Sequence, residues 1–143
     1  MNVETILRSK GSAVATVSPR ATIRDAAALL RRERIGALVV SGDHARVDGI
    51  LSERDIVHGL ADRGAALLDA TVDALMTRRV FTCTPLDSVG DLMAMMTEHR
   101  IRHIPVLRDG MLAGIVSIGD VVKHRLDEME YETSSLRSFI AGA

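Results

Sequence analysis

An internal repeat covers most of this 143-residue chain. The segment Val17-Ser18-Pro19 returns as Cys83-Thr84-Pro85, so the two prolines lie 66 residues apart. A repeat of this length predicts two copies of one supersecondary unit that stack to share a core. The same offset carries one apolar stripe with the spacing of an amphipathic helix onto another: Ile23, Ala26, Ala27 and Leu30 onto Val89, Leu92, Met93 and Met96.

Beyond the helical stripes, the offset between the copies falls to 65 residues. The segment 49–57, Gly-Ile-Leu-Ser-Glu-Arg-Asp-Ile-Val, maps onto 114–122, Gly-Ile-Val-Ser-Ile-Gly-Asp-Val-Val. One residue has therefore been lost between the matched segments, and the place is the polar turn, 41–46 in the first copy, whose counterpart at 108–111 is shorter. Surface turns tolerate such changes in length, so the turn predicts a β-hairpin within each unit.

Each unit is therefore expected to run β-α-β-β-α. We expect first strands at 13–17 and 80–84, and helices that end near 33 and 99. Thr22 and Ser88 are expected helix caps, each followed three residues later by an aspartate in a capping-box arrangement. Because one unit is too small to bury both faces of its sheet, we expect an α/β (α+β) fold with the two units packed around a pseudo-two-fold axis. A leading helix is expected at 5–10, and the last helix is expected to continue through 123–140.

The composition argues against several classes of function. The net charge is −1, and Tyr131, Phe81 and Phe139 are the three aromatic side chains, so a nucleic-acid partner is not expected. The chain has neither a membrane-length apolar run nor a secretion signal, so we expect a cytoplasmic protein without a membrane partner. The single cysteine, Cys83, falls in a predicted buried strand and is expected to be inert. The histidines do not have the spacing of metal ligands, so no metal site is expected. The sequence suggests neither a catalytic triad nor a carboxylate pair, so an enzyme is not expected.

The motif Gly-Ile-[Leu/Val]-Ser-x-x-Asp after a hairpin, present twice, resembles the CBS domain, and two copies in tandem resemble a CBS pair, or Bateman module. On this resemblance, 1–143 is a single stand-alone module. It divides into a first repeat at 12–61, a linker at 62–77, a second repeat at 78–126 and a helical tail at 127–143. The resemblance implies a regulatory, energy- or redox-sensing module that binds AMP, ADP, ATP or NAD, with S-adenosylmethionine ranked behind these. It also implies a homodimer and a regulated partner protein that the sequence does not identify.

Four residues of the repeated motif suggest how such a ligand would be held. Ser52 and Asp55, and again Ser117 and Asp120, lie where a strand gives way to a helix. The free N–H groups of a helix start attract phosphate, and a serine hydroxyl can donate to a phosphate oxygen. A carboxylate offers two acceptors to the two hydroxyls of a ribose. The alternative is an ordinary capping box without a ligand, and both interpretations can hold together.

The two repeats differ where the second has Arg102 and His103 and the first has Gly36 and Ala37. A basic pair at this position contacts phosphates in some family members, so we expect two unequal clefts, unless the pair is simply a surface arginine and a half-buried histidine. Arg54 and Thr77 are further candidates for phosphate contacts. The expected adenine walls, for which plain core packing is the alternative, are Val17, Leu38, Thr82, Ile104 and Pro105.

A different class of function remains open from the sequence alone. The chain could be a structural adaptor or dimerisation module with no physiological nucleotide, in which case a dimer face or the C-terminal helix would bind the partner. A nucleotide-dependent thermal shift separates the two classes, because a ligand that binds only the folded state stabilises it.

Overall fold

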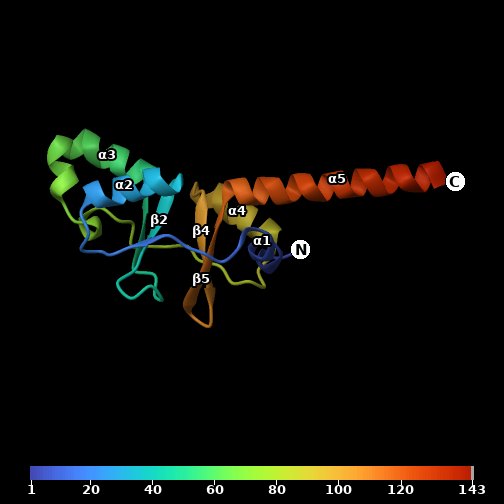
Figure 1. Ribbon diagram of the computed structural model, residues 1–143, viewed down its shortest axis with the longest axis horizontal. Coiled ribbons are helices and arrows are strands. Elements are labelled where there is room, and N and C mark those ends of the chain that lie inside the picture. Colours follow the sequence, from blue (N-terminus) through green and yellow to red (C-terminus); the bar gives the residue numbers. More distant parts are fainter. Residues whose placement is uncertain (143) are drawn as a thin grey trace.

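The computed structural model describes residues 1–142 as a mixed α+β fold of two similar units (Figure 1). Helix α1 (Val3–Lys10) precedes a first unit made of β1 (Thr16–Val17), α2 (Ile23–Glu33), β2 (Ala37–Val40), β3 (Gly49–Ser52) and α3 (Glu53–Arg63). Two short 3₁₀ helices, η1 (Gly64–Asp69) and η2 (Val72–Ala74), lead to the second unit. That unit contains α4 (Val89–His99), β4 (His103–Arg108), β5 (Met111–Ser117) and α5 (Ile118–Gly142).

The first strand of the second unit, expected at 80–84, does not form. In the first unit β1 pairs with β2 in parallel, and the Val39 amide donates to the Ala15 carbonyl. The equivalent pair in the second unit is Pro105 and Phe81, and proline has no N–H to donate. Only a single parallel bridge remains there, between Cys83 and Val106. The first unit thus has a three-stranded sheet and the second a two-stranded one.

The helix starts follow the sequence signals. Thr22 caps α2 by accepting a bond from the Asp25 amide at 3.1 Å, and Ser88 caps α4 by accepting one from the Asp91 amide at 3.0 Å. These two predicted caps are confirmed. Within residues 1–142, however, the aspartate completes a reciprocal box only at the other two sites, where α3 and α5 begin, so the boxes expected at Thr22 and Ser88 are simple caps.

The two units exchange the segments that lie upstream of them. Helix α1 precedes the first unit but packs into the core of the second, with Val3 fully buried there and the Val3 amide bonded to the Asp87 carbonyl at 2.9 Å. The segment 64–76 precedes the second unit but packs into the core of the first, where Leu67 and Val72 are fully buried. Helix α1 thus completes the core of the second unit and the segment 64–76 completes the core of the first, so these segments hold the two units together.

Helix α5 leaves the body after its first turns and projects away from it (Figure 1). Val121 is its one buried residue, and every residue from Met129 to Gly142 is exposed. No helix within residues 1–142 is long and apolar enough to cross a membrane.

Candidate functional site: two clefts between the units

Two cavities lie between the units. We call cleft A the cavity of about 690 Å³ and cleft B the cavity of about 820 Å³, both within the size range of small-molecule sites. They are related by the repeat. Cleft A is lined by 13–16 and 33–37 of the first unit, by Lys10, and by His103, Ile115, Ser117 and Asp120 of the second unit. Cleft B is lined by Thr77, 79–81 and 99–103 of the second unit, and by 36–37, Ile50, 52–55, Val57 and His58 of the first.

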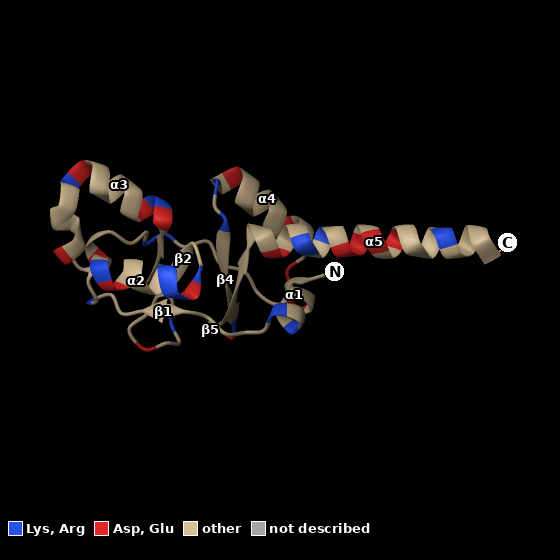
Figure 2. Cartoon of the chain, turned by 45° about the horizontal axis from the view of Figure 1, so that its top comes forward, with Lys and Arg blue, Asp and Glu red and all other residues tan. Residues whose placement is uncertain are grey.

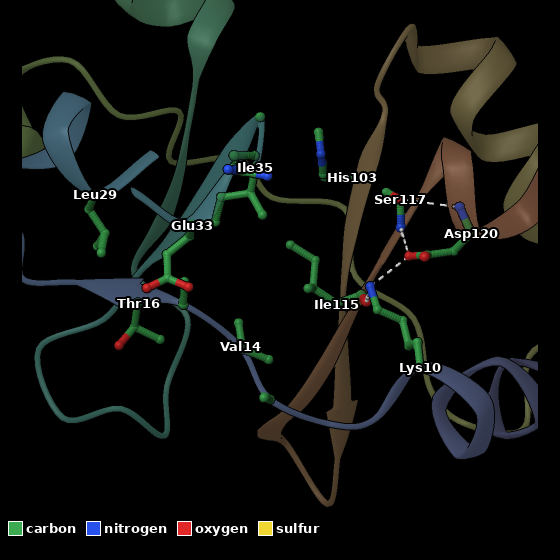
Figure 3. Close-up of a pocket in the computed structure, with 15 residues that line it drawn as sticks. Lys10, Val14, Thr16, Leu29, Glu33, Ile35, His103, Ile115, Ser117 and Asp120 are labelled. Atoms are coloured by element: carbon green, nitrogen blue, oxygen red, sulfur yellow. Dashed lines mark hydrogen bonds and ion pairs between the residues drawn. The ribbon is translucent and has the colours of Figure 1, made fainter. Parts of the chain in front are cut away.

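In cleft A, Asp120 is held by a backbone amide and a lysine (Figure 3). Its Oδ2 accepts bonds from the Ser117 amide at 2.8 Å and from Lys10 Nζ at 2.6 Å, while Lys10 also donates to the Ile115 carbonyl at 2.9 Å. Burial by itself would raise the pKa of Asp120, but the Lys10 ammonium and the Ser117 amide outweigh it and hold the pKa below the ordinary 3.8. Asp120 is therefore an anion, and its Oδ1 accepts no bond from residues 1–142.

In cleft B, Asp55 makes the corresponding arrangement with a threonine in place of the lysine. Its Oδ2 accepts from the Ser52 amide at 3.0 Å and from the Ser52 hydroxyl at 3.1 Å. The Thr77 hydroxyl approaches the other oxygen, Oδ1, at 3.4 Å. In both clefts the Ser-x-x-Asp motif therefore forms a capping box and also lies in a cavity wall. There it faces a side chain, Lys10 or Thr77, from the segment that leads into the other unit.

The two clefts differ in charge. Cleft B has four arginines, Arg54, Arg79, Arg100 and Arg102, against the carboxylates of Glu53 and Asp55. Cleft A has Lys10 and Arg34 against Glu33 and Asp120. Cleft B thus has an excess of positive charge, whereas the formal charges of cleft A cancel.

An aromatic layer further distinguishes cleft B. The Phe81 ring stacks on His99 with centroids 3.8 Å apart, and the Arg79 guanidinium lies 5.5 Å from the Phe81 centroid. The equivalent position in cleft A is the small Ala15. The stack offers a flat, partly cationic surface on which a planar ring could lie.

His103 lies between the clefts and lines both of them. Burial is the main cause that lowers the pKa of His103, and nearby Lys10 lowers it further, so the imidazole is neutral at neutral pH. Gly36 leaves room for this ring, because a Cβ built there would stand 3.3 Å from His103 Cε1. Gly36 and Ala37 likewise line both cavities, so the clefts share a wall.

The structure brings most of the residues predicted from sequence into the clefts. Ser117 and Asp120 line cleft A; Ser52, Arg54, Asp55, Thr77 and Arg102 line cleft B; and His103 lines both. Sequence reasoning missed many residues of the cleft walls, among them Lys10, Thr16 and Phe81. The signal for these three was their place at the start of each repeat. Thr16 lies in β1, Lys10 lies six residues before it, and Phe81 lies in the segment where a first strand was expected.

The structure places the predicted adenine walls outside the lining of both clefts. Val17, Leu38 and Ile104 are buried in the two cores, while Pro105 and the half-buried Thr82 line neither cleft. Alternate residues of a strand face opposite sides, and both sides of β2 are buried, so hydrophobicity could not tell which side faces the clefts. The neighbouring positions Thr16, Ala37 and His103 line the clefts instead.

Comparison with known proteins agrees with the repeat. The family model described as "CBS domain" matches twice, at residues 6–62 and 72–127. A mitochondrial CBS domain-containing protein of Arabidopsis thaliana, CBSX3, is 37% identical over 125 residues, which cover 85% of this chain and 61% of that protein. Hypoxic response protein 1 of Mycobacterium tuberculosis is 35% identical over 112 residues, which cover 78% of each chain.

Solved structures of CBS-domain proteins are similar to most of the chain. The CBS-domain containing protein ATU1752 from Agrobacterium tumefaciens has a TM-score of 0.85 at 45% identity, covering 87% of this chain and 99% of its own. The CBS domain pair of protein MJ0100, solved in complex with 5-methylthioadenosine and S-adenosyl-L-methionine, has a TM-score of 0.79 at 26% identity, covering 90% of this chain and 98% of its own. This chain belongs to the CBS-domain family and carries two CBS domains in tandem.

Proposed function

We propose that this CBS pair binds adenosine-containing nucleotides in clefts A and B, and that it serves as a regulatory module rather than an enzyme. The observation that carries the proposal is the pairing of an aspartate with a helix start at the wall of each cavity. The similar MJ0100 pair, which was solved with two adenosine compounds, supports the same class of ligand.

The proposed anchor for the ribose in each cleft is Oδ1, the aspartate oxygen that accepts no hydrogen bond within the capping box. In each box Oδ2 is used by the serine amide, and Oδ1 is directed elsewhere. A ribose hydroxyl can donate to Asp120 Oδ1 directly, or to Asp55 Oδ1 in place of the long 3.4 Å contact from Thr77. A ligand can therefore be held without loss of the cap that keeps the helix start in place.

The charge difference predicts a division of ligands. The four arginines of cleft B would neutralise a di- or triphosphate, and the Phe81–His99 stack would accept the adenine. Cleft A, whose formal charges cancel, suits a less charged compound such as AMP or a nucleoside. Among AMP, ADP, ATP and NAD, we therefore assign ATP or ADP to cleft B.

A regulatory role follows from the place of the clefts. Each cleft takes one wall from each unit, so a bound ligand contacts both units and favours one relative placement of them. A partner protein that binds the nucleotide-bound placement of the two units more tightly than the nucleotide-free placement would respond to nucleotide levels. Nucleotide and partner would then each raise the affinity for the other by the same factor.

The test is calorimetric titration of AMP, ADP, ATP, NAD and adenosine into the wild type and two variants, Asp55→Asn and Asp120→Asn. Asparagine keeps one acceptor for the cap but removes the charge that holds the ribose. We expect ATP binding to weaken by about tenfold or more in Asp55→Asn, since hydrogen bonds to charged groups contribute about 1.5–3 kcal/mol. Asp120→Asn should weaken AMP and adenosine by a similar factor.

A matched control is Asp91→Asn. Asp91 occupies the same third position of a helix, α4, but lines neither cleft, so this variant should bind every nucleotide like the wild type. The proposal fails if no adenosine compound gives measurable heat with the wild type, or if all three variants bind equally well.

A further inference from the structure

The projecting part of α5 presents one continuous apolar stripe. Its members are separated by alternating steps of four and three residues: Val122, Leu126, Met129, Thr133, Leu136 and Ile140. All five apolar members are at least half exposed, from 50% at Val122 to 65% at Ile140. Steps of four and three are the spacing of the core positions of a two-stranded coiled coil, and Thr133 is the single polar member.

The stripe is open to a partner. The residues of α5 that are not exposed are Asp120, Val121, His124 and Glu128, and they mark the side that packs toward the rest of the chain. At 100° per residue, the stripe lies roughly 140° around the helix from them, on nearly the opposite side. A second helix can therefore lie along the stripe without contacting the CBS domains of the chain that carries the stripe.

The exposed half of α5 also lacks support of its own. From Met129 to Gly142 no residue is buried, and the segment contains one threonine, three serines, a phenylalanine and a glycine, all weak helix formers. A helix of this length is marginal in water unless an apolar face is packed. Packing along the stripe would supply that support.

The charges beside the stripe select the partner and its direction. In a coiled coil each helix flanks its core with two rows, which here hold Lys123, Glu130 and Arg137 on one side, and Arg125, Glu132 and Phe139 on the other. Figure 2 shows the acidic residues of α5 between basic ones. In a parallel pair of identical helices, Arg125 meets Glu130 of the second copy and Glu132 meets Arg137, each twice. In an antiparallel pair aligned over the same stripe, Glu130 meets Glu130, Glu132 meets Glu132, and Lys123 meets Arg137, so every charged contact is repulsive.

We propose that α5 forms a parallel coiled coil with α5 of a second copy of this chain, with the two CBS bodies at the same end. The self-complementary charges favour a second copy over an unrelated helix. This surface lies apart from the nucleotide clefts, so it does not depend on the function proposed for them.

Sedimentation velocity across a concentration series tests the association. We expect a reversible dimer for the wild type and a monomer for Leu136→Glu. The matched control Leu86→Glu alters a side chain that is 82% exposed but lies outside α5, and it should leave the dimer intact. Retained protection of the α2 and α4 backbone amides from hydrogen exchange would show that both variants keep the two CBS domains folded. A monomeric wild type, or a Leu136→Glu variant that still dimerises, would overturn the proposal.

Charge exchange tests the direction. Either Glu132→Arg or Arg137→Glu alone should raise the dissociation constant of the dimer by about tenfold, and the double variant should restore it to within about twofold. Leu136→Cys should cross-link with its own counterpart under mild oxidation, whereas the outward-facing Ser138→Cys should not. An antiparallel pair would place the two 136 positions roughly 15 Å apart along the axis, so the lack of a cross-link at 136 would refute the parallel arrangement.

Discussion

Lys10 ties the exchanged helix α1 to the aspartate of cleft A, and its removal has a calculable effect. Lys10 Nζ donates to Asp120 at 2.6 Å and to the Ile115 carbonyl at 2.9 Å. A charge-assisted hydrogen bond contributes about 1.5–3 kcal/mol, but the Lys10 and Asp120 side chains remain 31% and 22% exposed, and solvent screens the pair. We therefore expect Lys10→Met to lower the free energy of unfolding by about 1 kcal/mol near pH 7.

The pH dependence of this loss identifies its cause. In the folded state the pKa of Asp120 lies below the ordinary 3.8, so the stabilisation is present above pH 3.8 and is lost as the pH falls through the folded value. Urea denaturation of the wild type and Lys10→Met at several pH values should show a gap in stability near pH 7 that narrows as the pH falls below 3.8.

Arg8→Met is the control on the same helix. Arg8 is 80% exposed, and its Nε lies 4.0 Å from Glu4, so its loss should cost less than about 0.5 kcal/mol. Equal losses for Lys10→Met and Arg8→Met, or a gap for Lys10→Met that stays constant down to about pH 3, would refute the reasoning.

Two further predictions concern the packing around the clefts. Gly49→Ala should destabilise the fold by about 1–3 kcal/mol, because a Cβ there would stand 2.7 Å from Met76 Sδ and 2.9 Å from the Thr77 carbonyl oxygen. Gly90→Ala changes an exposed position of α4 and should stabilise the fold. Thermal denaturation of both variants checks this, and two equal midpoints would contradict it. Burial raises the pKa of Cys83 to about 12, so a thiol reagent at pH 8 should modify Cys83 only after denaturant is added; rapid modification of the native protein would show that the thiol is exposed.

The sequence predicted what depends on pattern. The offset of 66 residues, the helix caps Thr22 and Ser88 and the two Ser-x-x-Asp motifs are local signals, and the structure has each of them where it was expected. The sequence also contains the cause of the missing strand at 80–84, since Pro105 occupies the position whose N–H the pairing requires. This cause becomes visible when the two copies are aligned, and hydrophobicity does not indicate it.

What could not be predicted depends on long-range placement. Helix α1 packs on the second unit although it precedes the first, and this exchange brings Lys10 to Asp120, 110 residues along the chain. The sequence also could not indicate which side of β2 faces a cleft, because all four of its residues are buried and hydrophobic. Leu38 and Ile104 were candidates for contact with adenine, with core packing as the alternative, and the structure places both in the hydrophobic cores.

A crystal structure of the protein grown with ATP is the most direct test of nucleotide binding between the two CBS domains. We expect density in cleft B, with the ribose against Asp55 and the phosphates among Arg54, Arg79, Arg100 and Arg102. ATP density found only outside both clefts, or well-ordered clefts with no nucleotide at saturating ATP, would contradict it.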